Sequence, residues 1–319
     1  MTNPVLSALR LPIVAAPMFL VSGPELVIAA CRSGIIGSFP TQNCRSVGDL
    51  DAWMGTITDR TDGSPVPWAA NLITHSSNAR LADDLRLIGE YQPPVVITAL
   101  GSPRPVMDVV KGYGGLVIAD VVNMGLARKA AAAGVDGMAC VSAGAGGHTG
   151  HLSPFAFTSA VRDFFDGLII VGGGIGDGYG VAGAVTAGAD LVYMGTRFLA
   201  SRESLAVAEY KAMVVAAGPD DLIVSDAITG TPASWLRDSI RSQGLDPDNL
   251  APATGAKNYT AGGTSIKRWK DLWAAGQGVQ TIRAIEPVSD IVDRIGAEYA
   301  VALRRAAELS PFVSHGSAE

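Results

Sequence analysis

The sequence predicts an α/β protein, a (β/α)8 TIM barrel with a small helical insertion domain after the eighth strand. The first observation behind this prediction is that eight short apolar runs alternate with helical stretches over residues 11–194. Buried parallel strands and their connecting helices give such a pattern. The second observation is that glycine-containing turns follow the seventh and eighth runs, where a barrel of this class binds phosphate groups.

The elements of the first half follow from apolar runs bounded by turn residues. A first strand over 11–18 is followed by Ser22 and Pro24, which are typical of a helix start, and by a helix over 25–33 that ends at Gly34. The other strands predicted in this half are 35–39, 68–73, 95–99 and 116–119.

The second half continues the alternation up to the eighth strand. In chain order, the predicted elements are a helix over 125–133, strands over 137–141 and 168–171, a helix over 181–187 and a strand over 191–194. A connecting helix returns the chain to the same end of a parallel sheet. The turns after the last two strands are therefore predicted to lie side by side.

The composition changes after the eighth strand. Residues 205–217 predict one more helix, and 218–275 then contain Gly-Pro, Asp-Pro and Ala-Pro turns, short helical pieces and three of the five tryptophans. Trp269 and Trp273 are four residues apart, a spacing typical of one face of a helix, and we expect them to pack. The last predicted helix covers 288–307.

This change predicts two domains. We expect a barrel domain formed by 1–210 and 276–319, and a helical insertion over 211–275 that covers the barrel mouth and shapes the substrate site. A homodimer is possible, and the sequence does not decide the oligomeric state.

Composition and charge limit the class of partner. The 319 residues are 48% hydrophobic and 17% charged, which is enough apolar material for a sizeable core. A net charge of −6, without a basic cluster to offset it, argues against a nucleic-acid or membrane-surface partner. No apolar run reaches the roughly 18 residues of a membrane span, and no leader pattern opens the chain, so we expect a cytoplasmic protein. Three widely spaced cysteines argue against a disulfide framework and a zinc site.

Two turns carry the features of a phosphate site. Gly172-Gly173-Gly174-Ile175 follows the seventh strand, and Gly195-Thr196-Arg197 follows the eighth. Glycines let backbone N–H groups approach a phosphate closely, and a helix that starts at the turn adds its positive end. The nearby G-x-G-x-x-G over 178–183 is a dinucleotide-binding pattern, which should begin at the end of a strand. Here it begins seven residues past the seventh strand, so a dinucleotide-binding sheet is disfavoured.

A glycine-rich loop over 144–151 follows the sixth strand and contains His148. Barrel enzymes place catalytic groups in such loops, and histidine readily gives or takes a proton near neutral pH. His148 is therefore predicted to be catalytic; the alternative is a histidine that braces the loop through backbone carbonyls. No carboxylate accompanies His148 and His151 at ligand spacing, so no metal site is predicted, and His151 is expected to be structural.

Several motifs in a fixed order resemble one family. They are APM in the first strand, WAANL in the third, AGGHTG after the sixth, GGGI after the seventh, GADLVYMGTRF in the eighth, and AAGQGV over 274–279. Together they resemble the FMN-dependent nitronate monooxygenases, formerly called 2-nitropropane dioxygenases, over nearly the full chain. Flavin-dependent enoyl reductases and acyl-CoA double-bond reductases share this scaffold and the loop histidine. The resemblance is therefore more specific for fold and flavin than for substrate.

The resemblance implies FMN contacts at the matching positions, which are Ala16, Pro17, Met18, Asn71, Gly146, Gly147, Gly173, Gly174, Gly195, Thr196 and Gln277. The first three would line the flavin ring, Asn71 would hydrogen-bond it, and Gln277 would approach it. The glycines of 146–147 would let the loop close, and 173–174 with 195–196 would hold the phosphate. His148 aligns with the family's catalytic histidine. For Asn71, satisfying a strand-end carbonyl is the alternative.

Asp120 departs from the family pattern. Many members carry a basic residue at the end of the fifth strand, where this chain has Asp120. The loss of that cation puts the contacts to the ribityl side of the flavin, and the substrate class, in question. Asp120 either binds flavin hydroxyls or caps the next helix.

The resemblance implies a leading function and an alternative. The leading hypothesis is a nitronate monooxygenase that oxidises alkyl nitronates with O2 to a carbonyl and nitrite, with His148 as the base or as the group that stabilises the nitronate. The alternative is an FMN-dependent double-bond reductase that acts on an enoyl-CoA-type thioester with NAD(P)H. A basic rim could then meet the nucleotide tail of the acyl-CoA; its residues are Lys257, Lys267, Arg268 and Lys270. A flavin-binding module without turnover is the third possibility.

Overall fold

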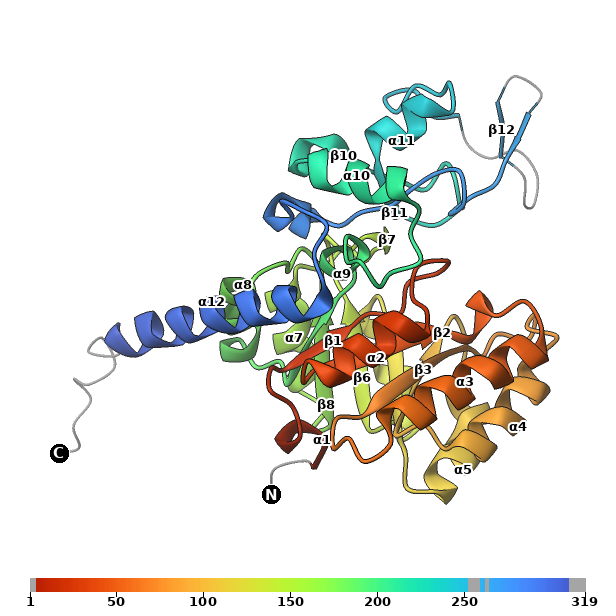
Figure 1. The fold of residues 1–319 in the computed structure, drawn as a ribbon, viewed down its shortest axis with the longest axis vertical. Helices are drawn as coiled ribbons and strands as arrows, with labels where there is room; N and C mark the ends of the chain where they lie inside the picture. The colour runs from red at the N-terminus through yellow and green to blue at the C-terminus, as the bar shows by residue number, and fades with distance from the viewer. Residues whose placement is uncertain (1–3, 252–258, 262–263, 310–319) are drawn as a thin grey trace.

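The main body of the protein is a closed barrel of eight parallel strands in the order β1-β2-β3-β4-β5-β6-β8-β9, surrounded by helices (Figure 1). The structure is a computed structural model that describes residues 4–251, 259–261 and 264–309. The barrel strands are β1 (Ile13–Ala15), β2 (Ile36–Pro40), β3 (Trp68–Ile73), β4 (Val95–Ala99), β5 (Leu116–Val121), β6 (Gly137–Val141), β8 (Leu168–Gly172) and β9 (Leu191–Met194). The predicted (β/α)8 barrel is confirmed.

Each barrel strand lies on one of the eight apolar runs that predict it. The first run, 11–18, is shortened most. The N–H of Ala16 still donates to the carbonyl of Met194 (2.9 Å), but Pro17 has no N–H with which to continue the ladder. The end of β1 therefore lies directly beside the end of β9.

The connecting helices are α2 (Pro24–Arg32), α3 (Val47–Thr61), α4 (Leu81–Tyr91), α5 (Arg104–Gly112), α6 (Met124–Ala132), α7 (Pro154–Arg162) and α8 (Gly178–Thr186). Local side chains fix several of their starts. The Ser46 hydroxyl accepts from the N–H of Asp49, and the Asp49 carboxylate accepts from the N–H of Ser46, so α3 begins with a capping box. Asp177 caps α8 by accepting from the N–H of Gly180 (2.7 Å).

The G-x-G-x-x-G pattern lies inside α8 and serves helix packing. Gly178 lets α8 approach α12 (Val288–Glu308), because a Cβ atom at this position would lie 2.3 Å from the carbonyl oxygen of Ile295. The N–H of Gly178 also donates to the Glu298 carboxylate (2.9 Å). Together with the closed barrel, these contacts agree with the rejection of a dinucleotide-binding sheet.

The N-terminal end of the barrel is apolar. The short helix α1 (Pro4–Ser7) covers it, and a small cavity beneath Val5 is lined by aliphatic and alanine side chains: Val14, Ile36, Ala69, Val95, Ile97, Leu116, Ile118, Leu168, Ile170 and Leu191. These side chains stabilise the barrel by burial. The groups that could perform chemistry lie at the opposite, C-terminal end.

The segment after β9 contains more strand than predicted. Its elements are α9 (Thr196–Leu199), α10 (Ala208–Ala216), η2 (Pro219–Asp221), β10 (Leu222–Ser225), β11 (Ala233–Leu236), α11 (Arg237–Ser242), β12 (Tyr259–Ala261), β13 (Thr264–Ile266), η3 (Gln277–Thr281) and α12. The pair β10 and β11 is antiparallel, and β7 (Gly147–His148), from the loop after β6, is the third strand of their sheet. The helical composition expected for 211–275 is thus corrected over 222–236, where the runs are short and rich in strand-forming residues.

Trp269 and Trp273 do not share a helix, contrary to the prediction from their spacing. The backbone of Trp269 has φ +67°, in the left-handed region, so the chain turns between the two residues. Both side chains do pack on aromatic neighbours: Trp269 stacks on Trp235 with ring centroids 4.5 Å apart, and Trp273 stacks on Tyr210 with ring centroids 5.0 Å apart. Lys257 lies outside the described residues.

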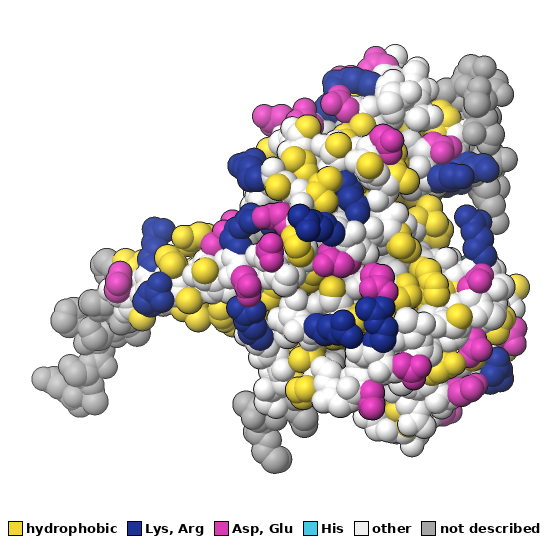
Figure 2. Space-filling view, viewed as in Figure 1, with side chains coloured by type: hydrophobic (Ala, Val, Ile, Leu, Met, Phe, Trp, Pro, Cys, Tyr) yellow, Lys and Arg dark blue, Asp and Glu magenta, His cyan; other side chains and the backbone are white. Residues whose placement is uncertain are grey.

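The surface mixes charges of both signs. On the face shown in Figure 2, Lys and Arg side chains alternate with Asp and Glu over the barrel and over the upper part of the molecule. The helix α12 projects from the barrel (Figure 1), and Val301 and Leu303 are exposed on its outer half. No helix in the described part of the chain is long and apolar enough to cross a membrane. Among the described residues, no group of three His, Cys, Asp or Glu could hold a metal ion.

Candidate active site

The two turns predicted to bind phosphate lie side by side at the C-terminal end of the barrel. They follow β8 and β9, which are neighbouring strands. Gly172 packs against Tyr193 so closely that a Cβ atom at Gly172 would lie 2.9 Å from the Cβ of the tyrosine. The turn 173–174 and the turn 195–196 leave the barrel from these neighbouring positions.

Gly173 has a backbone that only glycine adopts easily. Its φ is +147°, and a Cβ atom there would lie 2.5 Å from the carbonyl oxygen of Ala143. The loop after β6 and the turn after β8 are therefore in direct backbone contact, which supports their assignment to one site.

The segment 274–277, which follows the insertion, contacts the loop after β6 and the turn after β9. The loop after β6 in turn contacts the turn after β8. The carbonyl of Gly144 accepts from the N–H of Gly174 (3.0 Å) and from the N–H of Gln277 (2.8 Å). The N–H of Gly276 donates to the hydroxyl of Thr196 (2.9 Å). At Gly146, a Cβ atom would lie 2.6 Å from the nitrogen of Gly276. The structure thus brings Gly146, Thr196 and Gln277 together, as their assignment to one cofactor site requires.

Three N–H groups at this junction are open. Within the described part of the chain, the amides of Gly173, Gly195 and Thr196 donate to no protein acceptor. They belong to neighbouring turns, where an anion would satisfy them. The amide of Gly174 already donates to Gly144. Any contribution of Gly174 to phosphate binding would therefore be through the shape of the turn.

The loop after β1 borders the same turns. A Cβ atom at Gly195 would lie 3.5 Å from the sulfur of Met18 and 3.7 Å from the Cβ of Ala16. Asn43 fixes this loop, because its side-chain amide donates to the carbonyl of Met18 (3.0 Å) and its oxygen accepts from the N–H of Leu20 (2.8 Å). Ala16, Pro17 and Met18 thus flank the turn after β9.

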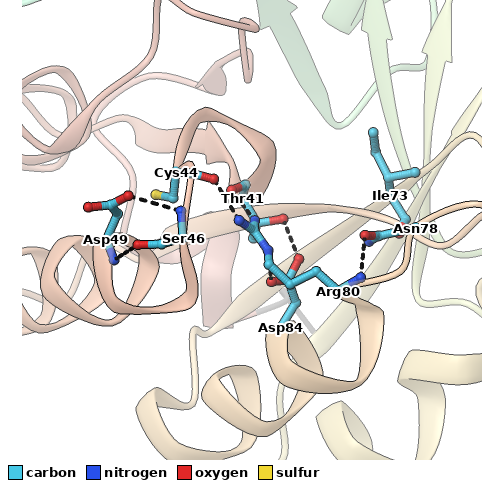
Figure 3. Close-up of polar contacts among 8 residues, drawn as sticks. All are labelled: Thr41, Cys44, Ser46, Asp49, Ile73, Asn78, Arg80 and Asp84. Atoms are coloured by element: carbon cyan, nitrogen blue, oxygen red, sulfur yellow. Dashed lines mark hydrogen bonds and ion pairs between the residues drawn. The ribbon is translucent and has the colours of Figure 1, made fainter.

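A network of hydrogen bonds and one ion pair joins the loop after β2 to the loop after β3 (Figure 3). Arg80 donates to the carbonyl of Thr41 (2.7 Å), to the carbonyl of Cys44 (2.6 Å) and to the carboxylate of Asp84 (2.7 Å). The second oxygen of Asp84 accepts from the Thr41 hydroxyl (3.1 Å). Since Thr41 begins η1 (Thr41–Asn43), this network also positions Asn43 and, through it, the loop after β1.

Asn71 combines features of both roles considered for it. It is buried on β3, and its side-chain N–H donates to the carbonyl of Ile97 on β4 (3.3 Å), as the strand-end alternative requires. Its side-chain oxygen accepts from no donor among the described residues. That oxygen is left for a ligand at the barrel mouth.

Asp120 does not cap the next helix. The cap of α6 is Asn123, whose side chain accepts from the N–H of Leu126 (2.9 Å), so this alternative is wrong. One carboxylate oxygen of Asp120 and the hydroxyl of Tyr193 are buried and have no hydrogen-bond partner. Burial raises the pKa of Asp120 to about 7, and the nearby Tyr193 hydroxyl opposes this rise. Burial, followed by the charge of Asp120, raises the pKa of Tyr193 well above its ordinary value.

His148 is held by its backbone and not by its side chain. Residue 148 lies opposite Ala233 in the sheet of β7 and β11, and the N–H of Thr149 donates to the carbonyl of Pro232 (3.1 Å). The imidazole makes no hydrogen bond to any described residue, so it does not brace the loop through carbonyls. Its ring is solvent-accessible and contacts Trp269 edge to face, with centroids 5.1 Å apart. Burial by the surrounding protein lowers the pKa of His148.

These unpaired groups fit a flavin mononucleotide. The open amides of Gly173, Gly195 and Thr196 suit its phosphate, and the Asp120 and Tyr193 oxygens without a partner are of a kind that hydroxyl or ring N–H groups would satisfy. Buried polar atoms without partners are costly, and a ligand that carries both donors and acceptors removes that cost.

Sequence reasoning missed three contributors to this site. Tyr193 lies two residues after Leu191 on β9 and therefore shares its face, which points into the barrel, a signal that was available from the strand pattern. The strand β11 and the tryptophan at 269 reach the site only through contacts between distant segments. His151 is exposed, and its side chain has no hydrogen bond to another described residue.

Comparison with known proteins places the chain in a family. The family model described as nitronate monooxygenase matches residues 4–298. The nitronate monooxygenase of Paraburkholderia phytofirmans is 28% identical, covering 79% of this chain and 80% of that protein. A Rhodococcus jostii protein named (3aS,4S,5R,7aS)-5-hydroxy-7a-methyl-1-oxo-octahydro-1H-indene-4-carboxyl-CoA dehydrogenase is 31% identical, covering 78% of this chain and 70% of that protein.

The solved structures agree. FabK from Thermotoga maritima has a TM-score of 0.77 at 26% identity, covering 95% of this chain and 97% of that chain. A nitroalkane oxidase from Streptomyces ansochromogenes has a TM-score of 0.78 at 23% identity, covering 95% of this chain and 100% of that chain, and shows the shared fold. The barrel, the loop histidine and these matches lead to one conclusion: the chain belongs to the nitronate monooxygenase family and is an oxidoreductase.

Proposed function

We propose that this protein is an FMN-dependent nitronate monooxygenase, which converts alkyl nitronates and O2 to a carbonyl compound and nitrite, with His148 as the base that forms the nitronate from a nitroalkane or as the group that stabilises a bound nitronate. The observation that carries the proposal is the state of His148. Its imidazole is solvent-accessible and unbonded at the barrel mouth, beside the turns with open amides.

In this proposal each unpaired group has a partner on the cofactor. The amides of Gly173, Gly195 and Thr196 would hold the phosphate, while Asp120 and Tyr193 would meet polar groups of the ribityl chain or ring. The flavin, when bound, supplies the electron acceptor. The protein residues bind it, orient it and exclude water from the reacting carbon.

His148 would act first as a base. Burial lowers its pKa, which favours the neutral imidazole that can accept the acidic proton of a nitroalkane. An N–H of the imidazole can donate to a nitronate oxygen and stabilise the negative charge. The accessible edge of the ring then lets the proton return to solvent. A bound nitronate needs only the second role.

The direct test uses purified, flavin-loaded protein and ethylnitronate in an oxygen electrode, with nitrite measured in parallel. We expect oxygen uptake that is matched by nitrite release. A yellow, FMN-containing protein that takes up no oxygen with ethylnitronate or propionate 3-nitronate would contradict the proposed substrate. Protein that cannot be loaded with FMN would contradict the cofactor.

A second candidate function has its own observation. The turn that carries Trp269, which contacts His148, also carries the exposed lysines Lys267 and Lys270. This rim could bind the phosphates of a CoA thioester, and the Rhodococcus relative is named for such a substrate. The candidate is therefore a double-bond reductase that acts on an enoyl-CoA with NAD(P)H.

A double variant separates the two candidates. Lys267→Glu with Lys270→Glu reverses the charge of the rim and should raise the KM for crotonyl-CoA, measured anaerobically with NADPH. The KM for ethylnitronate should stay the same, since this small anion does not reach the rim. A wild-type protein without NADPH-dependent reduction of crotonyl-CoA removes the second candidate for this acyl chain.

A further inference from the structure

The strand that carries His148 belongs to the sheet of the insertion. In β7, Gly147 lies opposite Ser234, and His148 lies opposite Ala233, on β11. The hydroxyl of Ser234 in turn donates to the carbonyl of Ala275 (2.8 Å), in the segment that contacts the loops after β6 and β9. The backbone of His148 is therefore fixed by the insertion as well as by the barrel.

The side chain of His148 has one ring neighbour among the described residues, Trp269. The two rings meet edge to face, with centroids 5.1 Å apart and an angle of 71°. Trp269 stacks on Trp235, with centroids 4.5 Å apart, and Trp235 is fully buried. The indole of Trp269 also covers Gly147, because a Cβ atom at Gly147 would lie 3.7 Å from this indole. A rigid aromatic column thus ends at the imidazole.

The backbone of Trp269 is strained. Its φ of +67° is unfavourable for a bulky side chain and persists only where the surroundings hold it. Here a compact turn does so. The N–H of Asp271 donates to the carbonyl of Lys267 (2.9 Å), and the Asp271 carboxylate accepts from the N–H of Lys267 (2.8 Å). Such strain is often kept where it places a functional side chain.

We infer that Trp269 is a positioning residue for His148, whose indole fixes the plane of the imidazole at the barrel mouth. The inference rests on the proposed role of His148 as the base. Since the imidazole has no hydrogen bond to a described residue, the aromatic contact is what restricts its rotation. Edge-to-face packing between rings is directional, so it can select one orientation where simple burial could not.

The contact also gives the inference a direct readout. Burial is the one cause of the lowered pKa of His148 among the described residues, and no charged side chain of these residues contributes. Trp269 supplies part of that burial on one side of the ring. Removing the indole should admit water there and bring the pKa of His148 back toward its ordinary value.

The test compares Trp269→Gly and Trp269→Leu with wild type in the flavin-loaded protein. Glycine removes the ring and is comfortable at a positive φ, whereas leucine keeps apolar bulk without an aromatic face. The matched control is Trp273→Phe, because Trp273 lies in the same segment but stacks on Tyr210. The pKa of His148 is followed by NMR of the imidazole signals, assigned with His148→Asn among the four histidines of the chain.

We expect the pKa of His148 to rise in Trp269→Gly, and kcat with nitroethane, which must be deprotonated, to fall about tenfold in both variants, with a smaller change in KM. Trp273→Phe should match wild type in both measurements. A folded Trp269→Gly with the wild-type pKa and kcat would overturn the inference. If the glycine variant does not fold, a Trp269→Leu protein with wild-type kcat overturns it equally. A shifted pKa in protein that is inactive with every nitronate would contradict the proposed substrate and leave the positioning role supported.

Discussion

Two polar clusters at the same end of the barrel differ in whether their hydrogen-bonding groups have protein partners. The cluster around Arg80 is closed, because Arg80 and Asp84 find protein partners on every side (Figure 3). The cluster at the barrel mouth is open, because oxygens of Asp120 and Tyr193 are buried without partners. The imidazole of His148 is also unbonded among the described residues.

The difference indicates that the Arg80 cluster holds the loops in place and that the cluster at the barrel mouth is available to a ligand. A buried ion pair with all its hydrogen bonds made fixes loop geometry, although it adds little net stability over an apolar substitute. Unpaired buried groups cost about 1–3 kcal/mol each, and a ligand with matching donors and acceptors at the barrel mouth would offset that cost. Changes in the closed cluster should therefore affect folding, and changes in the open cluster should affect binding and turnover.

The largest expected effect is on turnover, from the open cluster. His148→Asn removes the proposed base while the backbone of β7 stays paired, so kcat with nitroethane, whose acidic proton the base must remove, should fall by about 10²–10⁴-fold. The flavin content and the thermal midpoint should remain those of wild type. His151→Asn is the matched control, since His151 is exposed in the next turn of the same loop. Equal rates for wild type and His148→Asn would remove His148 from the mechanism.

The next effect is on stability, from the closed cluster. Arg80→Ala leaves the fully buried Asp84 without its cation, which should lower the free energy of unfolding by about 3–5 kcal/mol in urea titrations. Arg86→Ala removes an exposed pair with Glu90 (3.0 Å) and should cost under about 0.5 kcal/mol. Similar losses in the two variants would mean that the Arg80 cluster does not hold the loops.

Two glycine variants sharpen the comparison further. Gly173→Ala combines a positive φ with a Cβ atom 2.5 Å from the carbonyl of Ala143, so we expect a loss of about 2–4 kcal/mol in stability and weaker FMN binding. Gly134 also has a positive φ, but a Cβ atom there would meet open space. Gly134→Ala should therefore lower the stability by only about 1–2 kcal/mol. Fluorescence titration with FMN is the second measurement. Unchanged FMN affinity in a folded Gly173→Ala would contradict the phosphate site.

The last effect depends on pH and concerns Asp120. Its pKa is about 7 in the folded protein and about 3.9 in an unfolded chain. Between these values the unfolded chain releases the proton first. The Asp120 contribution to stability is therefore lost as pH rises, by up to about 1.4 kcal/mol per pH unit.

Asp120→Asn removes this pH dependence. In flavin-free protein, the stability of the variant minus that of wild type should increase from pH 5 to pH 7 and level off above pH 7, as measured by urea unfolding at each pH. A difference that does not change over this range would show that Asp120 ionises normally and is not desolvated.

The barrel could be predicted from the sequence because its strands are buried on both faces. Each such strand is a continuous apolar run, and the helix ends carry local signals such as the Ser46 cap. The three-stranded sheet could not be predicted, because β7 has two residues and its partner at 233–236 is distant in sequence. Trp269 and Trp273 show the opposite failure, in which a helical spacing falls on a turn.

For the site, local turn chemistry predicted the positions and not the hydrogen bonds. The glycines of 173–174 and 195–196 do lie side by side, yet one of the amides, that of Gly174, is taken by Gly144. Asp120 illustrates a second limit. Its position before α6 suggested a helix cap, but Asn123 occupies that role, and strand alternation turns Asp120 into the barrel. Which residues contact FMN stays a prediction.

The pairing of β7 with β11 has a consequence for engineering. Grafting the 218–275 region from a relative onto this barrel would break the edge that seats His148, unless the donor's loop after β6 is transplanted with it. The two stretches form one exchangeable unit despite their separation along the chain. Designers who wish to alter substrate preference by recombination should therefore cut around this pair and not between its members.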